Sequence, residues 1–357
     1  MCRKMCVLIT VSLLFATSLH AATLTVRQDG TGDFSDIGTA LSAAGKRDVI
    51  LVGRGTYYES LVVDKSVTIE AESGADATVL DGNGTNQIMV IEGRVRVSLV
   101  GFTFANGRAT DAAALMIWNQ AVVSVEDCAF VDNYATGSNA VHVRHTGTRA
   151  AFYRCDFLRN DCGVHSAALA MSTGRLIVED CSFVENTSKG VAGAVNCNGG
   201  RVDFHGNLFL RNSGNGEGAL VIQGSARGSV TNNTFHGNRG SGAVRIYGRT
   251  SFHNNIITST VGGPGLVSDG AKSRRCNMYF ENEGGAVVGT SLAESEFVTD
   301  PMYCDFTSDI FTLSGDSPAV GDKNRCGVIG AFDEGCTTSG AVATEKMTLG
   351  GLKCLYR

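Results

Sequence analysis

The stretch FVEN at residues 183–186 decides the fold, because close copies of it recur at nearly constant spacing. The other copies are FVDN at 130–133, FLRN at 157–160, FLRN at 209–212 and FHGN at 235–238. Their phenylalanines are 27, 26, 26 and 26 residues apart. A fixed period of this size marks a repeat architecture, in which each repeat packs on its neighbours.

Two further motifs keep the same period. Segments such as GAVRI at 242–246 carry an alanine that recurs after 26, 28, 26, 25 and 24 residues: Ala114, Ala140, Ala168, Ala194, Ala219 and Ala243. An alternating, strand-like segment such as LIVED at 176–180 precedes each FxxN, and turn residues separate the segments. Repeats of about 22 to 27 residues with three short strands and no helix predict an all-β chain, a right-handed parallel β-helix.

In such a fold, equivalent residues of successive coils stack into columns roughly 4.8 Å apart. The third residue of FxxN alternates in charge, in the order Asp132, Arg159, Glu185 and Arg211. Alternation predicts ion pairs between coils, because stacked like charges repel. The asparagine of FxxN predicts a hydrogen-bonded ladder, and we expect this asparagine to adopt the left-handed conformation of the turn.

The two ends differ from the repeats. Residues 1–21 have a charged start, an apolar run and a small residue at Ala21, which predicts a secretory signal peptide. Residues 34–44 predict a short amphipathic helix capped by Ser35 or Asp36, which would cover the first coil. We therefore expect coils over 22–290, a loop-rich C-terminal cap over 291–336, and a linker and short tail over 337–357. The mature protein is predicted to be a secreted or cell-surface monomer with no transmembrane span.

Composition narrows the possible partners. The formal net charge of −5 argues against a nucleic-acid partner. Aromatic residues make up 7% of the chain, which argues against a surface that stacks either bases or sugars. No metal-ligand spacing occurs among the twelve cysteines and seven histidines, so no metal site is predicted.

Four cysteines fall in the repeat columns and should pack as small apolar residues: Cys128, Cys155, Cys181 and Cys197. Cys326 and Cys336 flank a loop-rich segment and are the first candidate for a disulfide, and Cys276 with Cys304 is the second.

Several segments of the chain resemble known protein families. TVRQDGTGDFSDIGTALSAA at 25–44 and DVILVGRGTYYESLVV at 48–63 are similar to the opening of pectin methylesterases and other pectin lyase-like proteins. The alternation of GA-V/L-x-I with FxxN resembles repeats of polymorphic outer-membrane adhesins. DPMYCDF at 300–306 and CGVIGAFDEGC at 326–336 resemble the ends of secreted bacterial β-helix proteins of no assigned function. The resemblance covers nearly all of residues 23–357 and implies the fold.

The resemblance does not extend to the active-site motifs of these families. The sequence has no DFIFG-like or LGRPW-like segment of the esterases, and no NTD, DD or GHG of the polygalacturonases. It also lacks the RxPxxR context of pectate lyases.

Catalytic residues, if the protein has any, are therefore expected in the loops that interrupt the repeat. RHTGTR at 144–149 and DCGVH at 161–165 are such loops, and they could adjoin on successive coils. Arg144, His145, Asp161 and His165 form a hypothetical lyase cluster, since a lyase needs a base and a cation that neutralises the substrate carboxylate. The competing interpretation is that these are ordinary surface residues. A Cys162–His165 nucleophile pair is a weaker alternative.

Two functions follow. The favoured one is a β-helix that binds an extracellular polysaccharide or cell-surface glycan, or mediates adhesion, without catalysis. The alternative is a polysaccharide lyase or hydrolase acting on uronic-acid polymers. No cofactor is expected, and calcium would be needed only if the lyase alternative holds.

Overall fold

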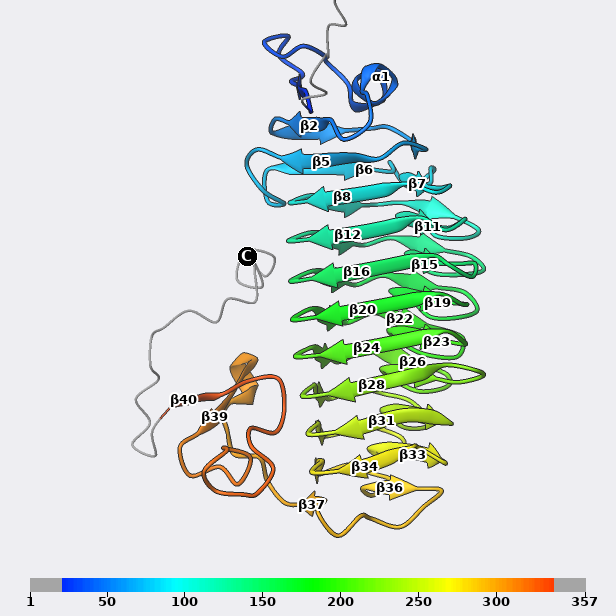
Figure 1. Ribbon diagram of the computed structural model, residues 1–357. Coiled ribbons are helices and arrows are strands. Elements are labelled where there is room, and N and C mark those ends of the chain that lie inside the picture. The colour runs from blue at the N-terminus through cyan, green and yellow to red at the C-terminus, as the bar shows by residue number, and fades with distance from the viewer. Residues whose placement is uncertain (1–20, 337–357) are drawn as a thin grey trace, which may run out of the picture.

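A computed structural model describes residues 21–336, which form a parallel β-helix whose three long sheets run the length of the stack (Figure 1). Sheet A has eleven strands: β1 (Thr23–Val26), β2 (Val49–Val52), β5 (Val67–Ala71), β8 (Arg96–Val100), β12 (Val122–Glu126), β16 (Arg149–Tyr153), β20 (Arg175–Glu179), β24 (Arg201–His205), β28 (Arg227–Thr231), β31 (Arg249–His253) and β34 (Ser273–Arg275). Every pairing in this sheet is parallel. The fold class predicted from the sequence is confirmed.

Sheets B and C complete the wall of each coil. Sheet B has eleven strands: β3 (Gly55–Tyr57), β6 (Thr78–Asp81), β9 (Thr103–Ala105), β13 (Ala129–Val131), β17 (Asp156–Leu158), β21 (Ser182–Val184), β25 (Leu208–Leu210), β29 (Thr234–His236), β32 (Ile256–Thr258), β35 (Met278–Phe280) and β37 (Phe297–Val298). Sheet C has ten: β4 (Leu61–Val63), β7 (Met89–Ile91), β11 (Leu115–Ile117), β15 (Val141–Val143), β19 (Leu169–Met171), β23 (Val195–Cys197), β27 (Leu220–Ile222), β30 (Val244–Tyr247), β33 (Leu266–Asp269) and β36 (Val287–Val288). Because β37 still pairs with β35, the last coil extends beyond residue 290.

A small fourth sheet lies in the loops between sheets B and C. It consists of two-residue strands: β10 (Arg108–Ala109), β14 (Tyr134–Ala135), β18 (Asp161–Cys162), β22 (Thr187–Ser188) and β26 (Ser213–Gly214). These strands keep the middle coils in register where their chains leave the three main sheets.

The phenylalanines of the repeat fill the interior. Phe130, Phe157, Phe183, Phe209 and Phe235 are each fully buried. Successive rings stack with centroids 4.6–4.8 Å apart and planes within 4–11° of parallel. The strand spacing sets this distance, so one ring per coil gives a continuous aromatic core.

The asparagines of FxxN form the predicted ladder. Asn186, for example, donates from Nδ2 to Asn212 Oδ1 at 2.9 Å and to the Phe157 carbonyl at 2.9 Å. The ladder satisfies buried amides that would otherwise cost free energy. The predicted conformation was wrong, however: the positive φ belongs to the preceding charged residue, as at Glu185 (φ 56) and Arg211 (φ 51). The asparagine side chain is used between coils rather than in its own turn.

The third residues of FxxN form the ion pairs that their alternating charge predicts, and a second column, which contains Asp127 and Arg154, forms one as well. Arg154 Nε lies 2.8 Å from Asp127 Oδ1, and Arg159 Nε lies 2.9 Å from Asp132 Oδ1. Arg211 reaches Glu185 at 3.2 Å. The four column cysteines are buried and unpaired, as expected for small apolar side chains.

A short helix, α1 (Ile37–Ala43), lies beside the first coil. Asp36 is its N-cap and accepts a hydrogen bond from the Thr39 amide at 2.8 Å. Ile37, Ala40 and Leu41 are buried in the main core. No helix among residues 21–336 has the length and apolar character needed to cross a membrane. The predicted signal peptide and the C-terminal linker and tail lie outside the described residues, apart from Ala21.

The C-terminal segment packs along the side of the stack (Figure 1). It contains β38 (Tyr303–Asp305), a 3-10 turn η1 (Phe306–Ser308), β39 (Ile310–Ser314) and β40 (Glu334–Cys336). Phe311 packs against Leu158, Val184 and other outward side chains of sheet B. These outward positions are apolar because this segment covers them.

The predicted disulfide Cys326–Cys336 is wrong, and so is the second candidate, Cys276–Cys304. The bonds are Cys276–Cys326 and Cys304–Cys336, with Cα atoms 5.8 and 6.0 Å apart. Cys336 ends β40, which pairs with β39 beside Cys304, whereas Cys326 lies against the stack.

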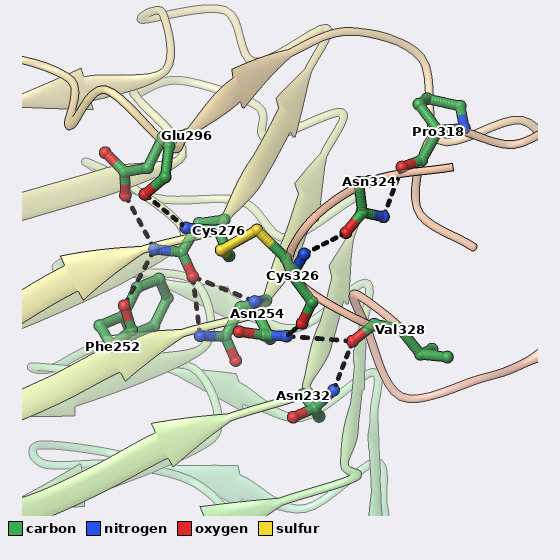
Figure 2. The surroundings of a disulfide bond; sticks show 12 residues. Asn232, Phe252, Asn254, Cys276, Glu296, Pro318, Asn324, Cys326 and Val328 are labelled. Carbon is green, nitrogen blue, oxygen red and sulfur yellow. Dashed lines mark hydrogen bonds between the residues drawn. A yellow bond between two sulfur atoms is a disulfide. The ribbon is translucent and has the colours of Figure 1, made fainter. Parts of the chain in front are cut away.

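Three successive coils hold the C-terminal segment around the Cys276–Cys326 disulfide, as Figure 2 shows. Asn232 and Asn254 donate to the carbonyls of Val328 and Cys326 at 2.8 Å each, and Cys276 provides the sulfur. Nothing in the repeat period could have predicted this non-periodic path.

Strand β17 of sheet B contains a buried carboxyl group, that of Asp156, and this predicts a pH effect. Burial raises the pKa of Asp156 to about 7, against a weaker opposing effect of the Ser182 hydroxyl. The folded protein therefore binds this proton more tightly than the unfolded chain. Its contribution to stability is present in acid and is lost as the pH rises from about 4 through 7. Asp156→Asn should raise the free energy of unfolding at pH 8 by at most about 4 kcal/mol, with little effect at pH 4.

Urea denaturation at both pH values would measure this difference. Asp132→Asn, at an exposed ion-paired carboxylate on the same side of the stack, is the matched control and should show no gain at pH 8. Equal destabilisation by Asp156→Asn at both pH values would contradict the assignment.

Candidate functional site

Sheet A begins its strands with arginine on five consecutive coils. The residues in this column are Arg149, Arg175, Arg201, Arg227 and Arg249. All five are exposed, and they directly oppose one another in the strand register. At the spacing of paired strands they extend over roughly 19 Å. We call this column the arginine stripe.

The arginine stripe differs from the other charged columns because its sign does not alternate. Asp203 lies 3.4 Å from Arg201 and 3.7 Å from Arg175. Within residues 21–336, no ion pair or side-chain hydrogen bond involves Arg149, Arg227 or Arg249. Like charges directly opposite each other on a sheet are unfavourable, so the fold gains nothing from this arrangement. Its guanidinium donors remain available to an anion.

The outer face of sheet A is hollowed at two places, one at the stripe and one before it in the stack. One groove of about 540 Å³ is lined by Arg201, Asp203, Arg227, Gly228, Ser229, Arg249 and Lys272. A second, also of about 540 Å³, lies towards the first coils, and its basic residues are Lys46, Arg47, Arg94 and Arg96. Some strands of sheet A carry a serine two residues after the position of the arginine column. These serines are Ser98, Ser124, Ser229, Ser251 and Ser273. Hydroxyl groups therefore occur at both ends of sheet A, whereas the three middle strands carry Ala151, Ile177 and Asp203 at this position.

A separate polar cleft of about 410 Å³ lies on the outer side of sheet C. Asp111 is its main acidic residue. His142 Nδ1 lies 2.8 Å from Asp111 Oδ1, and Arg144 Nη1 donates to Asp111 Oδ2 at 2.7 Å. Burial opposes ionisation of Asp111. The hydrogen bonds from His142 and Ser138, with the charges of His142 and Arg144, nevertheless lower its pKa to about 2. The carboxylate therefore stays ionised at all physiological pH values.

The structure brings together half of the cluster predicted from the sequence. Arg144 and His165 line the sheet C cleft, as expected for loops on successive coils. His145 and Asp161 are not among the described residues that line it. His145 bonds Asn119 at 2.7 Å and stacks on Trp118, while Asp161 lies in β18.

Cys162 does not have the environment of a nucleophile. Its side chain is fully buried and donates to the Ser138 carbonyl. Burial raises the pKa of the thiol, which disfavours the reactive thiolate. No group of three or more histidine, cysteine or acidic side chains in the described ranges is arranged to hold a metal ion.

Sequence reasoning missed Asp111 and His142, although a signal was present. His142 occupies the middle position of β15, where the neighbouring strands carry Met116 and Ala170. A polar residue in a mainly apolar column is unusual, and it could have directed attention to this coil.

Comparison with known proteins gives a likeness of fold. No family model matches the chain, and no curated protein matches it. A pectin methylesterase from carrot is similar over 80% of this chain and 91% of its own, with 14% identity and a TM-score of 0.36. A PL6 family polysaccharide lyase from Pseudopedobacter saltans is similar over 92% of this chain and 87% of its own, with 11% identity and a TM-score of 0.38. A pectin methylesterase from Aspergillus niger follows, with 15% identity, coverage of 80% and 92%, and a TM-score of 0.33.

The chain is similar in fold to these enzymes. These likenesses concern the fold alone.

Proposed function

We propose that this protein binds an acidic extracellular polysaccharide, rich in carboxylate groups, along the arginine stripe. The observation that carries the proposal is the in-register row of five exposed arginines on sheet A. Guanidinium groups bind carboxylates through paired, charge-assisted hydrogen bonds. A polymer with regularly spaced carboxylates suits a protein surface with regularly spaced cations.

The surroundings of the stripe support a sugar polymer. Serine hydroxyls two residues beyond Arg227 and Arg249 can exchange hydrogen bonds with sugar hydroxyls, and that of Ser229 donates to Asp203 Oδ1 at 3.0 Å. In the described part of the chain, no aromatic residue lines either groove, so nucleic-acid bases would find no stacking partner. The overall charge of −5 also opposes association with a nucleic acid.

Calorimetric titration tests the proposal. Polygalacturonate and alginate should bind, and their affinity should fall as ionic strength rises, because charge pairs on an exposed surface are screened. Neutral dextran is the control and should not bind. Equal affinity for dextran, or tighter binding of single-stranded DNA, would overturn the proposal.

The same mixtures test the lyase alternative. Unsaturated product would absorb in the ultraviolet, and Arg144→Ala or His165→Ala would abolish that signal if these residues act as charge neutraliser and base. The favoured function predicts binding with no unsaturated product.

A further inference from the structure

We propose that Ser172, His142 and Asp111 form an ester-hydrolysing triad in the sheet C cleft. His142 Nε2 lies 2.9 Å from Ser172 Oγ, and His142 Nδ1 lies 2.8 Å from Asp111 Oδ1. These are the contacts that a serine nucleophile, its base and an orienting carboxylate require. The three residues come from successive coils: Asp111 precedes β11, His142 lies in β15, and Ser172 follows β19.

The burial of the three side chains suits a nucleophile that faces solvent. Ser172 is exposed, His142 is 9% exposed, and the Asp111 side chain is 31% exposed. Asp111 is ionised, so it accepts the hydrogen of His142 Nδ1 and leaves the lone pair of Nε2 towards Ser172. The serine hydroxyl can therefore donate to the base in the resting state.

Two further contacts hold the relay in place. Arg144 donates to the second oxygen of Asp111 at 2.7 Å, and Ser138 Oγ lies 3.1 Å from His142 Nδ1. Ser138 Oγ in turn donates to Asn139 Oδ1 at 2.6 Å. Arg144 and Asp111 are positioning residues in this scheme, since they act through His142.

The next coil supplies hydrogen-bond donors beside Ser172. Asn196 and Asn198 line the same cleft, and Asn198 follows β23 as Ser172 follows β19. Asn196 Oδ1 accepts a hydrogen bond from Gln223 at 3.0 Å, which leaves its amide nitrogen as a donor. Such donors are needed to stabilise the oxyanion of a tetrahedral intermediate.

The reaction balances with water as the only co-reactant. Ser172 Oγ attacks the ester carbonyl carbon while His142 Nε2 takes the hydroxyl proton. The C–O bond to the alcohol then breaks, and the alcohol leaves with that proton. Water attacks the acyl-serine, His142 takes a proton from it and returns a proton to Ser172, and the carboxylic acid is released.

The position of Ser172 indicates the substrate class. Ser172 is three residues before Arg175 of the arginine stripe, so their Cα atoms are at most about 11 Å apart. The sheet C cleft and the grooves of sheet A share no lining residue, so a polysaccharide bound at the stripe must extend around the turn between the two sheets to bring an ester group to the nucleophile. This assignment, an esterified acidic polysaccharide, rests on the proposed function, whereas the triad chemistry does not.

Hydrolysis of p-nitrophenyl acetate and covalent labelling by a fluorophosphonate probe test the triad. The wild type should hydrolyse the ester, and mass spectrometry should place the label on Ser172. Ser172→Ala should abolish the label and lower kcat/KM by about 1000-fold or more. Asp111→Asn should lower the rate and shift the acid limb of the kcat/KM pH profile, because the imidazolium loses its counter-charge.

Ser225→Ala is the matched control, since Ser225 is an exposed serine in the loop that follows β27 and precedes β28. It should keep wild-type hydrolysis and labelling. Retained hydrolysis in a folded Ser172→Ala protein, or a wild type without hydrolysis or label, would overturn the triad.

The substrate and the proposed function can fail separately. Release of methanol from methyl-esterified polygalacturonate, or of acetate from an acetylated form, would support the substrate class. Hydrolysis of p-nitrophenyl acetate alone would overturn that class and leave the triad. Binding of polygalacturonate without any ester hydrolysis would overturn the triad and leave the proposed function intact. Ester hydrolysis without binding of polygalacturonate would overturn the proposed function and leave the triad intact.

Discussion

Polygalacturonate should bind roughly 30- to 150-fold more weakly when Arg175, Arg201 and Arg227 are changed together to alanine. Each arginine is exposed, and an exposed ion pair contributes at most about 1 kcal/mol, so three such pairs contribute about 2 to 3 kcal/mol. The loss should shrink at high ionic strength, because the missing interactions are screened there. Titration calorimetry at low and high salt measures both effects.

A second triple variant separates the stripe from net charge. Arg154, Arg159 and Arg239 are exposed or partly exposed arginines of other columns and loops. Their joint change to alanine removes the same charge and should change the affinity by less than about threefold, within the small effect of distant surface charges. An equal loss in both triple variants would show that binding depends on overall charge and would contradict a defined site.

Phe183→Ala should lower the free energy of unfolding by about 3 to 5 kcal/mol. Phe183 is fully buried, and its ring stacks on Phe157 at 4.6 Å and on Phe209 at 4.7 Å. Removing it leaves a cavity within the aromatic core that strands at fixed spacing cannot close. Urea denaturation followed by circular dichroism measures the loss.

The same substitution at an exposed phenylalanine provides the control. Phe306 is 50% exposed, and Phe306→Ala should cost less than about 1.5 kcal/mol, in proportion to the smaller apolar area that it buries. Comparable losses at both positions would contradict the stacked core as the main source of stability.

The fold was predictable because inward residues must repeat. Phe183 and its equivalents mark one column, and their period alone defines the parallel coils. The ion pairs of Arg159 and Arg211 followed from alternation of charge within one column. The arginine stripe could also be predicted from the sequence, since its members lie eight residues before the phenylalanine or isoleucine of each repeat.

The sheet C cleft and the disulfide pairing could not be predicted from the repeat period. Asp111 reaches His142 from a loop 31 residues earlier, and the repeat does not determine the path of a loop. Ser172 contacts His142 over 30 residues, in a segment where the coil is longer than its neighbours. The C-terminal chain returns along sheet B, so the distance of its cysteines along the sequence says little about which sulfurs meet.

The return of that segment along sheet B has a consequence for the order of folding. Each coil contacts the next over about 26 residues, so the stack can grow by short-range closures of similar cost. Asp309 must instead find Arg211 across 98 residues, and Ala331 must find Thr234 across 97. We expect the outer face of sheet B to be bare until synthesis is complete. During that interval the outward apolar side chains of sheet B, such as Leu158 and Val184, are uncovered and open to association with other chains.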